Sequence, residues 1–277
     1  MPPSRSRTAS RGRASEEQGT GRSGSLVVVG TGLMLGRHAT LETIDAIRGA
    51  EHVFHLVQNP AAEIWVRRLN PRISPLSDCF HEGTPRDRSY AMMASRIVEA
   101  VRAGEQVCAV FYGHPGVMVS PAYQAVTRVR REGYTARVLP GISAEDCLFA
   151  DLAIDPRDLG WQSFEATDFL LRRRKFDPTA ALILWQVGVL GEPGIRPKMQ
   201  ARPERLQRLV DTLAPHYPPR QAVILYEAPE FPISDPVIDR IALRRLAEER
   251  IEPKTTLYVP PRPATRLDKR VLRWFTA

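Results

Sequence analysis

The chain of 277 residues has only three cysteines and no long apolar run, and these absences exclude several classes of protein. No apolar stretch approaches the roughly 20 residues that cross a bilayer, and the N-terminus lacks the apolar segment of a secretory signal. The cysteines, Cys79, Cys108 and Cys147, are widely spaced, which indicates buried reduced thiols. Neither cysteines nor histidines have metal-ligand spacing, so no metal site is expected. We therefore expect a cytoplasmic protein without a membrane partner.

The body of the chain has little net charge, although the whole carries a net charge of +8. Residues 1–24 hold +3 and residues 262–277 hold +4, which leaves +1 on residues 25–261. A nucleic-acid groove gathers basic side chains on the folded body, so no nucleic-acid partner is expected. Residues 1–24 are rich in Ser, Arg and Gly, which predicts a disordered basic tail. Residues 262–277 are predicted to form a basic C-terminal tail.

Short apolar runs alternate with segments of helical periodicity along the body of the chain. Such alternation is typical of an α/β fold, in which helices cover the faces of a parallel sheet. The pattern restarts near residues 139–142, which predicts an N-terminal lobe over residues 25–140 and a C-terminal lobe over residues 141–261. Thr40 is the expected N-cap of the first helix. The predicted strands are 26–29, 52–56, 106–111, 137–139, 181–186, 222–226 and 256–259, and the predicted helices are 41–48, 86–103, 121–132, 144–152 and 241–250.

Two glycine-bearing turns follow predicted strands. The first, residues 30–36, has its third glycine one residue too late for a dinucleotide fingerprint, which favours a tight structural turn or a substrate-side loop. The second, residues 110–117, reads Val-Phe-Tyr-Gly-His-Pro-Gly-Val directly after an apolar strand. Ligands bind beyond the carboxyl ends of strands in open α/β sheets, and glycine allows close backbone approach. The second turn is therefore predicted to bind a ligand.

A third turn, residues 139–146, leads from a strand into a helix whose first amides carry partial positive charge. Ser143 and Ala144 are small and leave room for a ligand there. Glu145 and Asp146 either serve that ligand or simply complement the helix dipole.

Arg86 and Tyr90 stand at positions i and i+4 of a predicted helix and so share one face. A nearby cation is expected to lower the pKa of a phenol from its usual value of about 10 and to make its oxygen a better proton acceptor. The same spacing is also typical of an amphipathic surface pair, so spacing alone leaves both interpretations open.

The chain resembles the tetrapyrrole-methylase superfamily over about residues 25–261, and the motifs at residues 111–117 and 139–151 carry this resemblance. The stretches Glu-Ala-Thr-Asp-Phe-Leu at 165–170 and Leu-Trp-Gln-Val-Gly at 184–188 are similar to borosin methyltransferases, which N-methylate backbone amides of ribosomal peptides. The resemblance implies a two-lobed class III fold with S-adenosylmethionine (SAM) in the interlobe cleft. It also implies S-adenosylhomocysteine as product, and a homodimer.

The resemblance further implies the residues of the site. Its catalytic residues are Arg86, Tyr90 and Tyr112. An amide nitrogen is a poor nucleophile because its lone pair is delocalised, so methylation needs a base for the N–H and stabilisation of charge on the oxygen. An arginine and two phenols suit that task. The implied cofactor-binding residues are Tyr112, His114, Val117, Ser143, Ala144, Gln186, Ala228, Thr255 and Thr256.

The chain departs from the peptide-methylating branch at two places. Ser77 and Phe80 stand where those enzymes carry tyrosines, and Phe80 cannot exchange a proton, although His81 lies beside it. The C-terminal residues 262–277 are basic and carry no Val/Ile/Gly-rich core peptide. A separate precursor peptide, as in the split members of the branch, is therefore the expected partner.

Three hypotheses follow. The first is SAM-dependent N-methylation of a separate ribosomal precursor. The second is methylation of a tetrapyrrole or another small molecule on the same fold, which Ser77 and Phe80 keep open. The third is a non-catalytic homologue that binds a peptide.

Overall fold

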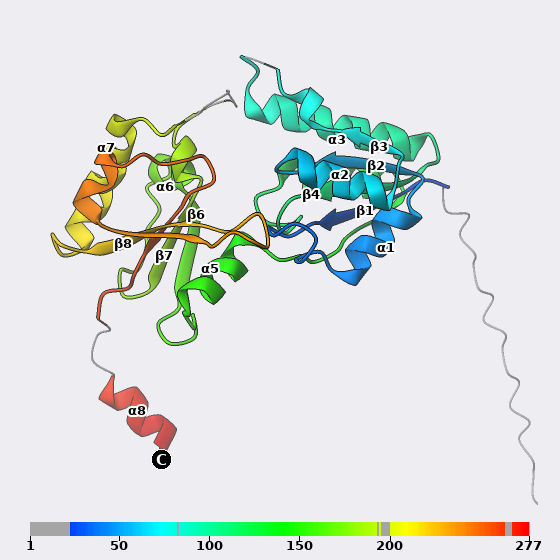
Figure 1. Ribbon diagram of the computed structural model, residues 1–277. Coiled ribbons are helices and arrows are strands. Elements are labelled where there is room, and N and C mark those ends of the chain that lie inside the picture. Colours follow the sequence, from blue (N-terminus) through cyan, green and yellow to red (C-terminus); the bar gives the residue numbers. More distant parts are fainter. Residues whose placement is uncertain (1–22, 82, 193, 195–199, 264–267, 277) are drawn as a thin grey trace, which may run out of the picture.

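The computed structural model describes residues 23–81, 83–192, 194, 200–263 and 268–276. Two α/β lobes lie next to each other (Figure 1), each built around a five-stranded sheet. The predicted two-lobed α/β architecture is therefore confirmed. The predicted disordered tail, residues 1–24, lies outside the described residues except for its last two.

The sheet of the first lobe has the strand order β3-β2-β4-β1-β5, and all its strands are parallel. The strand register places Gly30 opposite Phe111. Because the carboxyl ends of parallel strands share one edge, the turns that follow β1 and β4 lie together there. The strands are β1 (Ser25–Gly30), β2 (His52–Leu56), β3 (Ile73–Pro75), β4 (Gln106–Phe111) and β5 (Thr135–Val138).

Helices cover both faces of this sheet. Met93 and Val129 belong to the apolar cluster on the face covered by α3 and α4, and Ile47 and Val66 belong to the cluster under α1 and α2. Thr40 Oγ1 accepts a hydrogen bond from a backbone amide of the first helix, which confirms its predicted capping role. The helices are α1 (Leu41–Gly49), α2 (Pro60–Leu69), α3 (Arg86–Arg102) and α4 (Ser120–Arg131), and a 3₁₀ turn, η1 (Ser77–Cys79), precedes α3.

The sheet of the second lobe has the order β6-β7-β10-β8-β9 and is mostly antiparallel, with only β6 and β7 parallel. Helix α7 and the 3₁₀ segment η4 share one apolar cluster, and α5 contributes to the other. The strands are β6 (Trp161–Glu165), β7 (Ala181–Trp185), β8 (Ala222–Glu227), β9 (Val237–Ala242) and β10 (Thr256–Val259). The helical segments are α5 (Ala144–Leu152), α6 (Ala166–Leu171), η2 (Val187–Val189), α7 (Pro203–Leu213), η3 (Ala214–His216) and η4 (Leu243–Glu248).

Two predicted elements differ from the structure. The helix predicted over residues 241–250 is wrong, because residues up to Ala242 pair with β8 and residues 243–248 form the 3₁₀ segment η4. Its apolar residues Leu243 and Leu246 stand three apart, a spacing that a 3₁₀ helix satisfies as well as an α-helix does. The strand predicted over residues 137–139 begins earlier, because Thr135 already pairs with β1. Six further elements, α2, β3, β6, α6, α7 and β9, were not predicted from the sequence.

The predicted C-terminal tail contains a helix, α8 (Lys269–Thr276), which extends beyond the second lobe in Figure 1. Its side chains are exposed, including Trp274 and Phe275. Within the described ranges, no helix combines the length and apolarity that a bilayer crossing requires.

All three cysteines are buried and reduced, as predicted. Burial raises the pKa of Cys108 to about 12. For Cys147, burial and the nearby carboxylates Asp151 and Asp146 raise the pKa to about 11. These thiols are therefore parts of the packing rather than reactive groups.

This packing predicts slow thiol chemistry. At about pH 8, near the usual cysteine pKa of about 8.5, the folded protein should react with Ellman's reagent far more slowly than the protein in guanidinium chloride. Burial blocks access to Cys79, Cys108 and Cys147 and suppresses the thiolate of the last two. Equal rates in both conditions would contradict the packing described.

Candidate functional site

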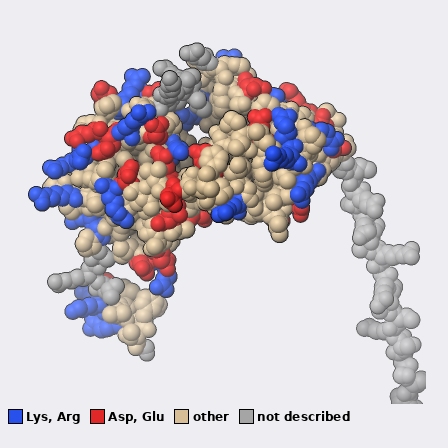
Figure 2. Space-filling view, viewed as in Figure 1, with Lys and Arg blue, Asp and Glu red and all other residues tan. Residues whose placement is uncertain are grey.

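A cavity of about 460 Å³ lies between the two lobes, which we call the interlobe cavity. Its volume is within the range of about 300–1,000 Å³ typical of small-molecule sites. In Figure 2 a hollow separates the lobes, and charged side chains of both signs are spread over their outer surfaces on this face. The lining includes Leu33, Arg86, Tyr90, Phe111, Tyr112, His114, Val117, Ser143, Ala144, Glu145, Trp185, Gln186, Glu252, Lys254 and Thr256.

The two glycine turns of the first lobe support each other at the floor of this cavity. The amide of Gly32 donates to Gly113 O at 3.2 Å, and the amide of Gly113 donates to Gly32 O at 2.9 Å. Gly30 allows this approach, since a Cβ there would lie 2.1 Å from Gly113 O. The first turn is thus a structural turn that fixes the second, and it also brings Leu33 to the cavity.

The loop after β4 places its predicted cofactor-binding side chains in the cavity. Tyr112, His114 and Val117 all line the cavity. The ring of His114 is held within the loop, since its Nδ1 accepts a hydrogen bond from the amide of Gly116 at 2.9 Å. Val117 lines the cavity and is 42% exposed, so part of its apolar side chain is open to solvent.

The start of α5 forms a second wall. Ser143 and Asp146 make a capping box, in which Ser143 Oγ accepts from the amide of Asp146 at 3.2 Å and donates to its carboxylate at 2.6 Å. Ala144 and Glu145 line the cavity next to Ser143. Burial raises the pKa of Glu145, although a hydrogen bond from Trp161 opposes the shift. Asp146 thus serves the helix cap, whereas Glu145 faces the cavity.

Arg86 connects the lobes across the cavity. Its guanidinium donates to Gln186 Oε1 at 2.9 Å, so that the first residue of α3 contacts the residue after β7. Gln186 has a left-handed backbone conformation with φ of 59°, which is uncommon for a residue with a side chain and is often found at functional sites. The Nε of Arg86 is buried and finds no acceptor among the described residues. An unpaired buried N–H costs about 1–3 kcal/mol, so a ligand oxygen is its natural partner.

Tyr90 and Tyr112 lie beside Arg86, and both have a raised pKa. The sequence spacing had predicted a lowered pKa for Tyr90. Burial raises the pKa of Tyr90 and outweighs the opposing charge of Arg86. Desolvation by the surrounding cavity wall likewise raises the pKa of Tyr112, again against Arg86, although 47% of this residue is exposed to solvent. The expected direction for Tyr90 is therefore wrong, because desolvation of the phenolate exceeds its attraction to the guanidinium. Both phenols are protonated at neutral pH.

Phe80 packs against Tyr90 from the side, with ring centroids 6.3 Å apart and an interplanar angle of 69°. It therefore supports the Tyr90 ring and adds no polar group to the site. Ser77 starts the 3₁₀ turn η1 and, like Phe80 and the exposed His81, lies outside the lining of the cavity.

The structure brings most of the predicted site residues to one cavity and places two behind it. Ala228 packs with the apolar cluster beneath α5. Thr255 is 3% exposed and donates a hydrogen bond to Glu227. The predicted residues that line the cavity are Arg86, Tyr90, Tyr112, His114, Val117, Ser143, Ala144, Gln186 and Thr256.

Several lining residues were missed by the sequence analysis. Leu33 lies in the glycine turn that failed the dinucleotide fingerprint, and Trp185 lies directly before Gln186. Lys254 precedes the Thr255–Thr256 pair. Trp185 and Lys254 are chain neighbours of residues that had been identified, and Leu33 belongs to the turn after β1, so proximity to a strand end was the signal available. In the part of the chain that the structure describes, no group of three His, Cys, Asp or Glu side chains could hold a metal ion.

Comparison with known proteins identifies relatives of this architecture. The family model of tetrapyrrole (corrin/porphyrin) methylases matches residues 25–228. A uroporphyrin-III C-methyltransferase from Thermus thermophilus superimposes with a TM-score of 0.61 at 20% identity, covering 86% of this chain and 92% of its own. A diphthine synthase superimposes with a TM-score of 0.58 at 15% identity, covering 91% and 95% of the two chains. The predicted class III fold is therefore confirmed.

Two curated relatives are more similar in sequence. A methyltransferase/ribosomally synthesized cyclic peptide dendrothelin A precursor from Dendrothele bispora is 39% identical over 254 residues, 90% of this chain and 61% of the relative. The corresponding omphalotin A precursor from Omphalotus olearius is 39% identical over 253 residues, 89% of this chain and 60% of the relative. The chain thus spans about three-fifths of the length of these relatives.

The contact between the glycine turns predicts that two alanine substitutions differ in their effect on stability. Gly30→Ala should lower the free energy of unfolding by about 2 kcal/mol or more, because its Cβ would overlap Gly113 O and Pro115. Gly49→Ala, the matched control at the end of α1, meets nothing within 4 Å and should leave stability unchanged or raise it by up to about 1 kcal/mol. Urea unfolding measures both. Equal effects of the two substitutions would show that the turns are not in contact.

Proposed function

Because the chain belongs to the tetrapyrrole methylase family, we propose that it is a SAM-dependent methyltransferase that N-methylates backbone amides of a separate precursor peptide. The family match supports the class of reaction. The curated relatives, whose names join a methyltransferase to a ribosomally synthesized cyclic peptide precursor, support the peptide substrate. The observation that carries the proposal is the buried, unpaired Nε of Arg86 beside Tyr90 and Tyr112 in the interlobe cavity.

The residues present in the cavity suit the methyl donor. The loop after β4 and the start of α5 supply backbone and small side chains at the carboxyl edge of a parallel sheet, where open α/β folds bind nucleotides. The carboxylate of Glu145 offers a partner for a cationic group. When bound, SAM supplies the methyl group. Tyr112, His114, Val117, Ser143, Ala144, Gln186 and Thr256 would hold it, with Ala228 and Thr255 supporting this wall from behind.

The protein must hold a substrate amide so that its nitrogen becomes nucleophilic. The free N–H of Arg86 is placed to donate to the amide oxygen, where charge develops as the nitrogen proton leaves. Tyr112, protonated because burial raises its pKa, is a second donor for that oxygen. Tyr90, as the phenolate, accepts the proton from nitrogen. Its raised pKa makes this phenolate a strong base that is only sparsely populated at neutral pH.

A separate peptide fits the arrangement of the described chain. Helix α8 lies beyond the second lobe in Figure 1, and none of its residues is among those that line the interlobe cavity. A second recess of about 360 Å³ shares Arg86, Tyr90 and Gln186 with the interlobe cavity and adds Tyr123 and Glu165. A peptide in this recess would reach Arg86 and Tyr90 while the methyl donor occupies the interlobe cavity. The homodimer and the cytoplasmic location remain predictions.

Co-expression with a short candidate precursor peptide, sought among the neighbouring reading frames, tests the proposal. We expect the peptide to gain mass in whole methyl steps, with fragment ions that place the methyl groups on backbone nitrogens. Arg86→Gln and Tyr90→Phe should each reduce the methyl-transfer rate at least about a hundredfold, the usual size of an acid–base or oxyanion contribution. Arg88→Gln, on the exposed face of the same helical turn, is the matched control and should retain full activity.

Each contrary result supports a different alternative. Bound SAM with an unchanged peptide, but methylated porphyrinogen, would favour the small-molecule hypothesis. Failure to bind either SAM or S-adenosylhomocysteine would favour a non-catalytic peptide-binding protein. Full activity of Arg86→Gln would refute the assigned catalytic role.

The raised pKa of Tyr90 predicts the pH dependence of the reaction. The phenolate population grows about tenfold per pH unit below its pKa, which lies above the usual value of about 10. The single-turnover rate should therefore keep rising from about pH 7 to about pH 9 without a plateau. Tyr90→Phe should remove this slope from any residual activity. A rate that levels off near neutral pH would contradict Tyr90 as the proton acceptor.

A further inference from the structure

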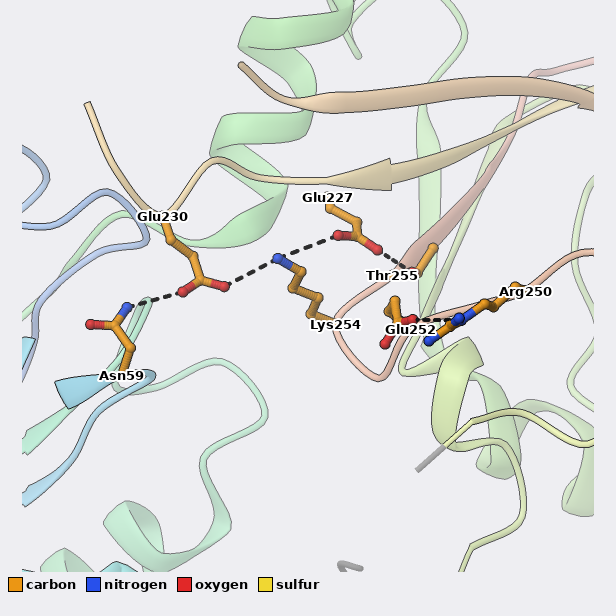
Figure 3. A network of polar contacts seen from close by, with 7 residues as sticks. All are labelled: Asn59, Glu227, Glu230, Arg250, Glu252, Lys254 and Thr255. Carbon is orange, nitrogen blue, oxygen red and sulfur yellow. Dashed lines mark hydrogen bonds and ion pairs between the residues drawn. The ribbon is translucent and has the colours of Figure 1, made fainter. Parts of the chain in front are cut away.

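Glu230, in the connection between β8 and β9, contacts both lobes at once. Its carbonyl oxygen accepts from the amide of Leu35 at 2.9 Å. Its carboxylate accepts from Asn59 Nδ2 at 3.0 Å and pairs with Lys254 Nζ at 3.2 Å. Figure 3 shows this chain of contacts running from Asn59 in the first lobe through Glu230 and Lys254 to Glu227 in the second.

On the side of the first lobe, Glu230 holds two segments, of which the first glycine turn reaches the interlobe cavity. Leu35 belongs to the first glycine turn, which brings Leu33 to the cavity lining. Asn59 is the N-cap of α2, since its Oδ1 accepts from the amide of Ala62 at 2.9 Å. Asn59 therefore uses its oxygen for the helix and its amide nitrogen for the other lobe.

On the side of the second lobe, the contact continues into the cavity wall. Lys254 lies between Glu230 and Glu227, the latter at 3.4 Å, and it lines the cavity. Glu227 in turn accepts from Thr255, whose neighbour Thr256 also lines the cavity. Partial burial alone would lower the pKa of Lys254, but the two glutamates raise it. Lys254 is therefore positively charged and connects Glu230 to Glu227 in the cavity wall.

We propose that Glu230 is a positioning residue that fixes the separation of the two lobes across the interlobe cavity and so sets the affinity for the methyl donor. This inference rests on the proposed function. The lobes also meet through the hydrogen bond between Arg86 and Gln186. The contact between Glu230 and Asn59 is a second point of attachment, so the lobes cannot rotate freely about the first one. Lys254 is 55% exposed, so solvent weakens its ion pair and the stability of the fold depends little on it. The effect of Glu230 should therefore appear in binding rather than in folding.

An exchange of the two partners tests the proposal. Asn59→Asp keeps the oxygen that caps α2 but places a carboxylate against Glu230, and should weaken S-adenosylhomocysteine binding about tenfold, as expected for a lost hydrogen bond plus like-charge repulsion. In the double variant Asn59→Asp/Glu230→Gln, the new amide at position 230 donates to the new carboxylate at position 59. This reverses the direction of the hydrogen bond and should recover most of the wild-type affinity. Glu230→Ala should weaken binding to a similar extent as Asn59→Asp. Isothermal titration calorimetry measures Kd, and thermal unfolding measures Tm.

The control is Glu248→Gln, which removes a carboxylate paired with Arg245 inside the second lobe alone, and should leave Kd unchanged. The proposal is supported when Kd rises in Asn59→Asp and Glu230→Ala while Tm stays near the wild-type value, and when the exchanged pair recovers Kd. It is overturned when both single variants bind with wild-type affinity, or when the exchanged pair binds no better than Asn59→Asp. If the wild-type protein itself does not bind S-adenosylhomocysteine, the proposed function fails rather than the role of Glu230.

Discussion

Each lobe supplies only part of the wall of the interlobe cavity, so the site exists only while the two lobes are held at one separation. The first lobe contributes the loop after β4 and the start of α3, and the second contributes α5, the end of β7 and the segment before β10. Polar contacts across the gap maintain this arrangement, with Arg86 bound to Gln186 and Glu230 bound to Asn59. The interlobe contacts therefore shape the cavity together with the residues that line it.

The second constraint is the balance between burial and charge at Arg86. A guanidinium next to two phenols would lower their pKa in water, yet burial reverses the direction for both Tyr90 and Tyr112. The result is a resting site with one permanent positive charge, an unpaired buried N–H and two protonated phenols. Such a site stabilises negative charge that develops on an oxygen, which is the main requirement for making an amide nitrogen nucleophilic.

The sequence was informative where chemistry and backbone geometry coincide. Tyr112 and His114 follow a buried strand and precede glycines, and the structure places both in the cavity. Local patterns failed where tertiary contacts decide the outcome, as for residues 241–250, whose pairing with β8 is invisible in their own spacing. The pKa of Tyr90 was beyond reach for the same reason, since it depends on how much protein surrounds the ring. Glu230 carried no local signal, because its partners Leu35 and Asn59 are far away in the sequence.

On the proposed function, a methyl donor binds between the lobes and contacts both. Hydrogen–deuterium exchange with and without S-adenosylhomocysteine tests it most directly, because exchange is read separately for each segment of the chain. The account predicts slower exchange on ligand addition in residues 112–119 of the first lobe and in residues 144–148 and 255–258 of the second, with little change in α8. Slower exchange confined to one lobe, or no change in either, would contradict it.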